Sequence, residues 1–139
     1  MEDLNKYMDK QPNELSAIRG MVQDITDRKE NYLSLDKVKI LTATELEDNK
    51  IMTNVYHDVI ERNDAVIDFI LDIKNTIFKI KLSRDRVDRN TQLGLQQAKQ
   101  YDYFISLLQS ILDMMSDERS KMDRVVRYYE KTFSYYKDF

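Results

Sequence analysis

The sequence contains no cysteine and no tryptophan, and it has only two glycines and one proline among 139 residues. Without cysteine the chain cannot form a disulfide framework or a thiolate metal site, and this absence fits a reducing compartment. So few glycine and proline residues leave little signal for turns, which favours a small number of long helices. The length fits a single unit, so we expect one helical domain over residues 1–139.

Long apolar runs are also missing. No stretch approaches the ~18 consecutive apolar residues that a transmembrane helix requires, and no signal-peptide core is present. We therefore expect no membrane span and no secretion by a signal peptide. The expected location is cytoplasmic, which for a viral protein means the host cytoplasm or the virion.

Histidine occurs once, at His57. A di-iron carboxylate site of the ferritin kind needs two Glu-x-x-His pairs, and a Ser-His-Asp triad would depend on this one residue without any Gly-x-Ser-x-Gly elbow. No glycine-rich phosphate loop is present either. We interpret His57 as an exposed helix residue, with a pH-sensing or metal role as the alternative. The chain is predicted not to be an enzyme: no catalytic residue, metal, cofactor or small-molecule substrate is expected.

A heptad pattern dominates what is present. From Ala98 to Tyr136, apolar residues recur at alternating spacings of four and three, and only Arg119 interrupts them. Such spacing is typical of a long helix with one buried seam. Neighbouring apolar positions widen this seam to about half of the helix circumference, more than a two-stranded coiled coil requires, so the helix should contact at least two others.

A second seam lies earlier in the chain, where Met52, Val59, Val66, Ile73 and Ile80 recur every seven residues. Asn63 stands among the apolar residues that complete this seam. It has two possible roles. A polar seam residue can fix register and oligomeric state, whereas a residue at the bundle edge would hydrogen-bond to water.

The predicted helices cover residues 13–33, 45–82 and 95–137, with a reversal of the chain near 83–94. Pro12 fits the first turn of the first helix, and Asn13 can cap it. Residues 34–44 are less regular, and we interpret them as a continued or kinked helix rather than a strand. Thr44 and Glu47 match a capping box, which places a helix start near residue 45, after a break near 42–44.

The predicted fold is all-α: a long-helix bundle or coiled-coil-like helical hairpin with a shorter N-terminal helix. We expect it to assemble as a homo-oligomer, because two seams of this length and width exceed what one short helix can cover. The residues predicted to form the core or oligomer seam are Val59, Val66, Ile70, Ile73, Ile77, Ile80, Ile105, Leu108, Leu112, Met115, Met122, Val126, Tyr129 and Phe133.

Charge is distributed unevenly. Residues 1–72 hold 9 Lys or Arg and 16 Asp or Glu, a net charge of −7, whereas residues 73–139 hold 13 and 9, a net charge of +4. The two halves could attract each other within a bundle or between protomers, or the second half could bind a polyanion. The candidate polyanion contacts are Lys79, Lys81, Arg84, Arg86, Arg89, Arg124 and Arg127.

The tract over residues 124–139 mixes arginine and lysine with tyrosine and phenylalanine. Basic and aromatic side chains together suit single-stranded nucleic acid, which needs charge for phosphates and rings for base stacking. They equally suit a protein interface, because tyrosine and arginine are favoured anchors there. Tyr129 and Phe133 also lie in phase with the buried seam, so core or protomer contact is the third possibility.

These patterns predict a non-enzymatic helical assembly or adaptor protein, which self-associates through its seams and binds a macromolecular partner. The alternative is an oligomeric nucleic-acid-binding accessory protein, of the viral packaging or recombination type, that uses the basic residues of the second half.

Overall fold

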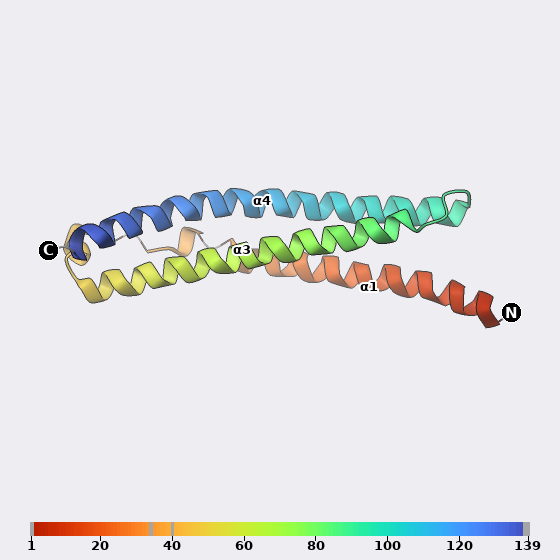
Figure 1. Ribbon diagram of the computed structural model, residues 1–139, viewed down its shortest axis with the longest axis horizontal. Coiled ribbons are helices and arrows are strands. Elements are labelled where there is room, and N and C mark those ends of the chain that lie inside the picture. Colours follow the sequence, from red (N-terminus) through yellow and green to blue (C-terminus); the bar gives the residue numbers. More distant parts are fainter. Residues whose placement is uncertain (1, 34, 40, 138–139) are drawn as a thin grey trace. The chain divides into compact units, whose positions relative to one another are not determined.

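The structure is a computed structural model. It describes the backbone of residues 2–33, 35–39 and 41–137. It describes the side chains of residues 14–33, 35, 37–39 and 41–132. No strand occurs among them, so the prediction of an all-helical chain is confirmed. The elements are α1 (Glu2–Tyr32), the 3-10 turn η1 (Leu35–Lys37), α2 (Ala43–Leu46), α3 (Asn49–Asp85) and α4 (Gln92–Lys137), as Figure 1 shows. Together the helices form a bundle-like fold.

Helix α1 begins at Glu2, so the predicted start near residue 13 is wrong. Pro12 lies inside the helix instead of in its first turn. A proline lacks the N–H that would bond the carbonyl four residues earlier, so one backbone hydrogen bond of α1 cannot form there. The rest of a 31-residue helix still keeps its own bonds.

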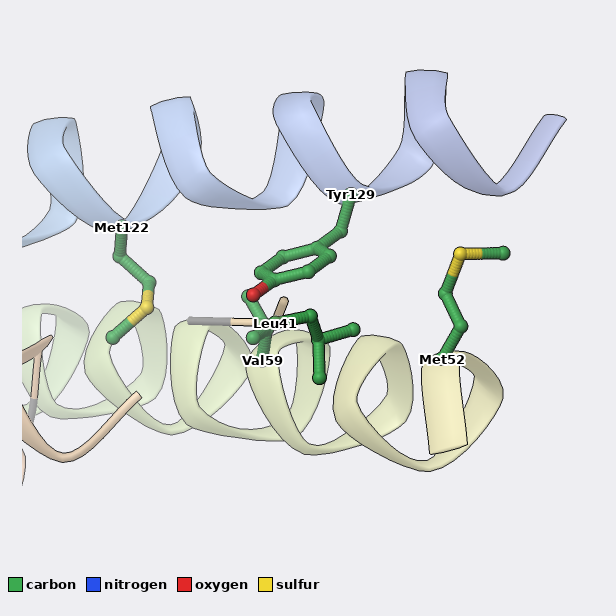
Figure 2. Packing of buried hydrophobic residues seen from close by; sticks show 5 residues of the cluster. All are labelled: Leu41, Met52, Val59, Met122 and Tyr129. Atoms are coloured by element: carbon green, nitrogen blue, oxygen red, sulfur yellow. The ribbon is translucent and has the colours of Figure 1, made fainter. Parts of the chain in front are cut away.

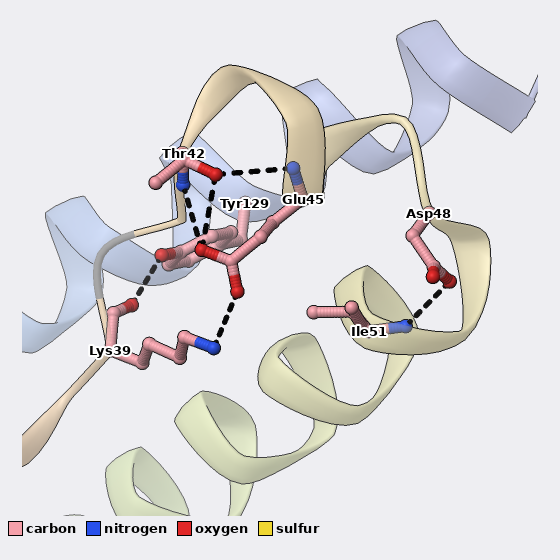
Figure 3. A network of polar contacts seen from close by, with 6 residues as sticks. All are labelled: Lys39, Thr42, Glu45, Asp48, Ile51 and Tyr129. Carbon is pink, nitrogen blue, oxygen red and sulfur yellow. Dashed lines mark hydrogen bonds and ion pairs between the residues drawn. The ribbon is translucent and has the colours of Figure 1, made fainter.

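The segment between α1 and α3 is not a continued helix, which corrects the expectation for residues 34–44. Only the three residues of η1 and the four of α2 are helical. The capping box also lies two residues earlier than predicted: Thr42 is the N-cap, and Glu45 is its partner. The Thr42 hydroxyl accepts a hydrogen bond from Glu45 N–H at 3.2 Å, and the Glu45 carboxylate accepts one from Thr42 N–H at 3.2 Å (Figure 3).

Helix α3 begins at Asn49, four residues later than predicted, because Asp48 caps it. Its Oδ1 atom accepts hydrogen bonds from the N–H groups of Lys50 at 2.9 Å and Ile51 at 3.2 Å. Two of the N–H groups that a helix start leaves unpaired are thereby satisfied.

The connection between α3 and α4 is tighter than the predicted reversal at 83–94, since α3 continues to Asp85 and α4 begins at Gln92. Asp88 organises this turn: its carboxylate accepts from Asn90 N–H at 2.9 Å, and its carbonyl accepts from the Thr91 hydroxyl at 3.1 Å. Thr91 caps α4 by accepting from Gly94 N–H at 2.9 Å. A Cβ atom at Gly94 would lie 1.7 Å from the Asp88 carbonyl oxygen, so the turn requires glycine there.

The chain divides into two compact units. The first unit comprises residues 1–29 and 72–112, and the second comprises residues 30–71 and 113–139. Helices α3 and α4 each contribute to both. The two units are described separately below.

The first unit has a core made by α1, the end of α3 and the start of α4. Polar contacts join these helices at its edges: Arg28 bonds Asp72 at 3.0 Å, and the Ser83 hydroxyl donates to Glu14 at 2.5 Å. The buried apolar side chains of this unit are Ile18, Val22, Ile25, Ile73, Ile77, Ile80, Ala98, Tyr101, Phe104, Leu108, Ile111 and Leu112.

The second unit has its core between the start of α3, the end of α4 and the irregular segment before α2. Leu41 from that segment packs with Met52, Val59, Met122 and Tyr129 in one cluster (Figure 2). At the other end of the unit, the rings of Tyr32 and Phe69 stack with centroids 4.1 Å apart.

Most of the predicted seam residues are buried within a single chain. Ile105 and Val126 are half-buried, and the side chain of Phe133 lies outside the described residues. The buried members are Val59, Val66, Ile70, Ile73, Ile77, Ile80, Leu108, Leu112, Met115, Met122 and Tyr129. The chain itself therefore covers these seams, and a second copy is not needed to exclude water from them.

Candidate interaction surfaces

In the second unit, the segment of residues 35–39 is attached to α4 at both of its ends. The Leu35 N–H donates a hydrogen bond to the Glu118 carboxylate at 2.7 Å, and the Tyr129 hydroxyl donates one to the Lys39 carbonyl at 2.5 Å. Glu118 and Tyr129 are eleven residues apart, which is about three helical turns. We call residues 35–39 the crossing segment, because it follows α4 between these two attachment points.

A hollow of about 460 Å³ lies between the crossing segment and α4. Aliphatic and aromatic side chains form most of its surface, and two basic side chains stand beside them. The residues that line it are Leu35, Val38, Lys39, Arg124, Val125, Tyr128 and Tyr129. Tyr128 remains 57% exposed, so a large aromatic ring is available to a binding partner at the edge of the hollow.

The two basic residues of the hollow differ in their partners. Lys39 is paired with Glu45 at 2.5 Å, whereas Arg124 is exposed and has no ion pair within the described part of the chain. The hydrogen bonds from Lys39 and Thr42 hold the pKa of the Glu45 carboxyl below its ordinary value, so this acid stays ionised (Figure 3). Arg124 is therefore the cation that an anionic ligand of this hollow would meet first.

Tyr129 lines the hollow and is also a buried member of the core cluster. Burial raises the pKa of its hydroxyl, which keeps the group protonated and able to donate to the Lys39 carbonyl at neutral pH. The adjacent Tyr128 is exposed. The rings of Tyr128 and Tyr129 are arranged edge to face, with their centroids 5.3 Å apart. Two consecutive residues of the aromatic tract thus differ: Tyr129 packs in the core, and Tyr128 lies at the surface.

The remaining aromatic residues of the predicted tract, Phe133, Tyr135, Tyr136 and Phe139, have side chains outside the described residues. Arg127 is exposed and pairs with Asp123 at 3.1 Å, one turn earlier on α4. Of the two basic candidates on this part of α4, only Arg124 lines the hollow.

The other polyanion candidates lie at the end of α3 and in the following turn. Arg84 is half-buried and contacts Asp102 at 3.1 Å and Asp85 at 3.6 Å, so its charge is already neutralised. Four residues are exposed and have no ion pair among the described residues: Lys79, Lys81, Arg86 and Arg89. These four belong to the first unit, whereas Arg124 and Arg127 belong to the second.

Two smaller hollows occur in the first unit. One, of about 380 Å³, is lined by α1 and α3 and includes Asp24 and Asp72, which Arg28 bridges at 2.9 and 3.0 Å. The other, of about 360 Å³, lies beside Arg19 and Tyr103. Neither brings together an acid, a base and a nucleophile in a way that supports catalysis.

His57 is exposed on α3. No group of three or more possible metal ligands occurs among the described residues. Within the same residues, none of the helices has the length and apolar character that crossing a bilayer requires.

Two surfaces were not predicted from the sequence. The hollow depends on the crossing segment, which has no distinct sequence pattern. The second surface is a pair of exposed apolar residues near the end of α3 in the first unit, Phe78 and Leu82. Their spacing of four places them on one helix face, and this spacing was a signal that could have revealed them.

No protein-family model, curated protein sequence or solved structure matches this chain.

Proposed function

We propose that this chain is a non-enzymatic helical adaptor that associates with itself and docks a partner protein in the hollow beside the crossing segment. The observation that carries this proposal is the hollow itself. It has a volume of about 460 Å³ and mostly apolar walls, and two long-range hydrogen bonds attach the crossing segment beside it to α4. Most large apolar side chains elsewhere in the second unit are packed in its core. An unfilled apolar surface next to an exposed tyrosine and an unpaired arginine is typical of a protein-binding site.

The chemistry of the hollow defines its partner. Val38 and Val125 offer apolar contact, and Tyr128 offers an exposed ring. Arg124 offers a positive charge that has no ion pair in the described part of the chain. The complementary ligand is a segment of a partner protein with a large apolar side chain beside a carboxylate. The apolar side chain would fill the hollow, and the carboxylate would pair with Arg124 at its edge.

Selection from a displayed peptide library on the immobilised chain tests this proposal. We expect the enriched peptides to share an apolar residue next to an acidic one, and to lose at least tenfold in affinity for the variants Tyr128→Ser and Arg124→Glu. Tyr103→Ser is the matched control, because Tyr103 is another exposed tyrosine of α4 and does not line this hollow. Selection without enrichment, or peptides that bind both hollow variants normally, would contradict the proposal.

Self-association and coiled-coil-like pairing of α3 with α4 are part of the same proposal. One core cluster contains two pairs of residues from α3 and α4: Met52 with Tyr129, and Val59 with Met122. In each pair the two residue numbers add to 181. A constant sum is what antiparallel helices with matched heptads produce. Because these seams are covered within the chain, contacts between copies must use the outer surface. Sedimentation velocity over a concentration series tests self-association, and a monomer at up to about 100 µM would contradict it.

Nucleic-acid binding is the second candidate, supported by four basic residues that are exposed and have no ion pair among the described residues: Lys79, Lys81, Arg86 and Arg89. Binding to duplex DNA through four phosphate contacts would weaken as salt is added. A plot of the logarithm of the binding constant against the logarithm of the salt concentration would have a slope of about −3.6. Titration of labelled DNA at several salt concentrations measures this slope. The candidate requires that Arg86→Ala with Arg89→Ala weakens binding and reduces the slope by about 2, whereas Lys131→Ala on α4 leaves both unchanged.

A further inference from the structure

The smaller hollow beside Arg19 lies wholly within the first unit. Its volume is about 360 Å³, and it is lined by Arg19 of α1 and by four residues of α4: Lys99, Gln100, Tyr103 and Phe104. Such a volume falls within the range of small-molecule pockets, about 300–1,000 Å³. The lining includes two cations and no carboxylate, so its charge suits an anionic ligand.

The two cations of this hollow have no ion pair among the described residues. Arg19 is exposed, and its guanidinium donates a long hydrogen bond of 3.4 Å to the side-chain oxygen of Gln100. Lys99 immediately precedes Gln100 on α4 and is also exposed. Two positive charges that line one hollow repel each other, and a bound anion would replace this repulsion by attraction to both.

The acidic residues that are nearest in sequence to these cations have other partners. Asp102, three residues after Lys99, pairs with Arg84 of α3 at 3.1 Å. Glu14, five residues before Arg19, accepts a hydrogen bond from the Ser83 hydroxyl. Asp24, five residues after Arg19, pairs with an arginine one turn later on α1 at 2.9 Å. A ligand is therefore the natural source of negative charge for this hollow.

Two aromatic side chains complete the hollow. Tyr103 is 65% exposed, the largest exposed fraction among the exposed large apolar and aromatic side chains of the described residues. Phe104 is buried, and the centroids of the two rings are 5.9 Å apart. The packed ring fixes the position of the exposed one, so Tyr103 offers a ring face on which a planar group can stack.

We propose that this hollow binds a nucleotide, with the base stacked on Tyr103 and the phosphate paired with Arg19 and Lys99. A terminal phosphate carries a charge of about −1.5 to −2 at neutral pH, so it can neutralise both cations, whereas a carboxylate can neutralise only one. The Gln100 amide can hydrogen-bond to the polar edge of the base. The ring of a phosphotyrosine has no such edge, and this difference favours a nucleotide over a phosphorylated peptide.

The same chemistry fits a free nucleotide and the phosphorylated end of a single-stranded nucleic acid. In both cases one base stacks on an aromatic ring while one terminal phosphate is bound. The inference goes beyond the proposed function, because the hollow beside the crossing segment lies in the second unit and takes a peptide. It also uses none of the four basic residues of the nucleic-acid candidate, so each of the three proposals can fail alone.

An NMR titration of the isotope-labelled chain with adenosine monophosphate tests the site. We expect saturable shifts of amide signals in residues 15–23 and 96–107, with a dissociation constant of about 1 mM or lower. Adenosine and inorganic phosphate should each bind at least tenfold more weakly, since each supplies only half of the ligand. An absence of saturation at about 10 mM, or shifts confined to other residues, would overturn the inference.

Substitutions in the hollow test the role of each group. Arg19→Ala, Lys99→Ala and Tyr103→Ser should each weaken binding of adenosine monophosphate at least fivefold, whereas Tyr103→Phe keeps the ring and should bind normally. Tyr128→Ser and Lys131→Ala are the matched controls, because both residues are exposed on α4 in the second unit. Circular dichroism verifies that each variant is folded. Normal binding by the three weakened variants would overturn the inference.

Phenyl phosphate tests the preference for a base, because it has a ring and a phosphate but no polar edge. It should bind at least fivefold more weakly than adenosine monophosphate, and Gln100→Leu should reduce this preference. Equal binding of the two ligands to the natural chain would overturn the assignment to a nucleotide and would favour a phosphotyrosine peptide.

A single-stranded oligodeoxyadenylate, with and without a terminal phosphate, distinguishes the two sources of the nucleotide. A phosphorylated strand that binds more tightly than adenosine monophosphate would assign the site to strand ends, and weaker binding would assign it to the free nucleotide. Either result sustains the inference. Strand binding that needs no terminal phosphate and is lost in Arg86→Ala with Arg89→Ala, but not in Arg19→Ala, would overturn it if adenosine monophosphate also fails to bind.

Discussion

The two units of the chain complete their cores in different ways. In the first unit the third element is helix α1, and its polar contacts to α3 join side chains, as between Arg28 and Asp72. In the second unit a largely irregular segment takes part in the core, and its contacts to α4 join side chains to the backbone, at Leu35 and Lys39. Each unit uses α3 and α4, so the difference comes from what packs against them.

The physical reason is backbone hydrogen bonding. A helix satisfies its own N–H and carbonyl groups, and neighbours need only match its side chains. An irregular segment leaves these groups unpaired, and neighbouring side chains must satisfy them. Glu118 and Tyr129 of α4 perform this role. Because the crossing segment follows α4 less evenly than a helix would, the hollow remains between them, and the unit with the less regular core has the largest of the three hollows described above, at about 460 Å³.

The largest effect should come from Gly94→Ala in the first unit. The added Cβ would lie 1.7 Å from the Asp88 carbonyl oxygen, so the turn before α4 must rearrange, and we expect a loss of about 3 kcal/mol in the free energy of unfolding. Urea denaturation measures it. Gly20→Ala is the control, because nothing lies within 4 Å of its new Cβ. It should raise stability by about 0.5–1 kcal/mol, since alanine is the better helix former.

Tyr129→Phe tests the attachment of the crossing segment. The substitution keeps the ring in the core but removes the hydrogen bond to the Lys39 carbonyl, so we expect a loss of about 1 kcal/mol. Amide hydrogen exchange should accelerate in residues 35–46 and stay unchanged in the first unit. Tyr101→Phe, which alters a buried tyrosine of the first unit, should leave exchange in residues 35–46 unaffected. Equal acceleration by both variants would show that the segment is not held at Tyr129.

A gain of about 1 kcal/mol is expected for Asn63→Leu in the second unit. The Asn63 Oδ1 atom is buried and has no hydrogen-bond partner within the described chain, so an apolar side chain removes a desolvation penalty. Asn54→Leu, at an exposed position of α3, should change stability by less than about 0.5 kcal/mol. Thermal denaturation compares them. Destabilisation by Asn63→Leu would instead assign the amide a specific role in the packing of the seam.

The smallest effect should appear at alkaline pH and should involve both units. Burial raises the pKa of Tyr101 in the first unit and of Tyr129 in the second. Between the ordinary tyrosine pKa near 10 and the raised values, the unfolded chain loses protons that the folded chain keeps, so stability falls as pH rises through this window and is independent of these groups below it. Replacing either tyrosine by phenylalanine should reduce the fall. A Tyr103→Phe control at an exposed position should not.

Much of the fold could be predicted from local patterns. The heptad spacing of Val59, Val66, Leu108 and Met115 predicts which face of each long helix is buried, and all four side chains are buried. Helix limits were predicted less well, because short capping motifs are ambiguous. Thr44 and Glu47 match the capping pattern as well as Thr42 and Glu45 do; in the structure Thr42 and Glu45 form the capping box, and Lys39 also contacts the Glu45 carboxylate.

The candidate surfaces were only partly accessible to sequence reasoning. It placed Tyr129 in the buried seam, where its side chain is buried, but it also counted Tyr128 in the wide apolar face, whereas Tyr128 is exposed. It also counted Arg84 as a free cation, whereas Asp102, eighteen residues away, neutralises it.

The amino-acid sequence by itself determined that this chain forms long helices with buried heptad seams, because that periodicity is a local property that one helix expresses alone. The division into two units, the crossing segment and the hollow were decided only by the tertiary structure. The placement of the crossing segment involves the hydrogen bonds of Leu35 with Glu118 and of Lys39 with Tyr129, whose partners lie more than 80 positions apart in the sequence. No local pattern specifies such partners. Backbone groups that a helix does not satisfy must find partners wherever the folded chain brings them.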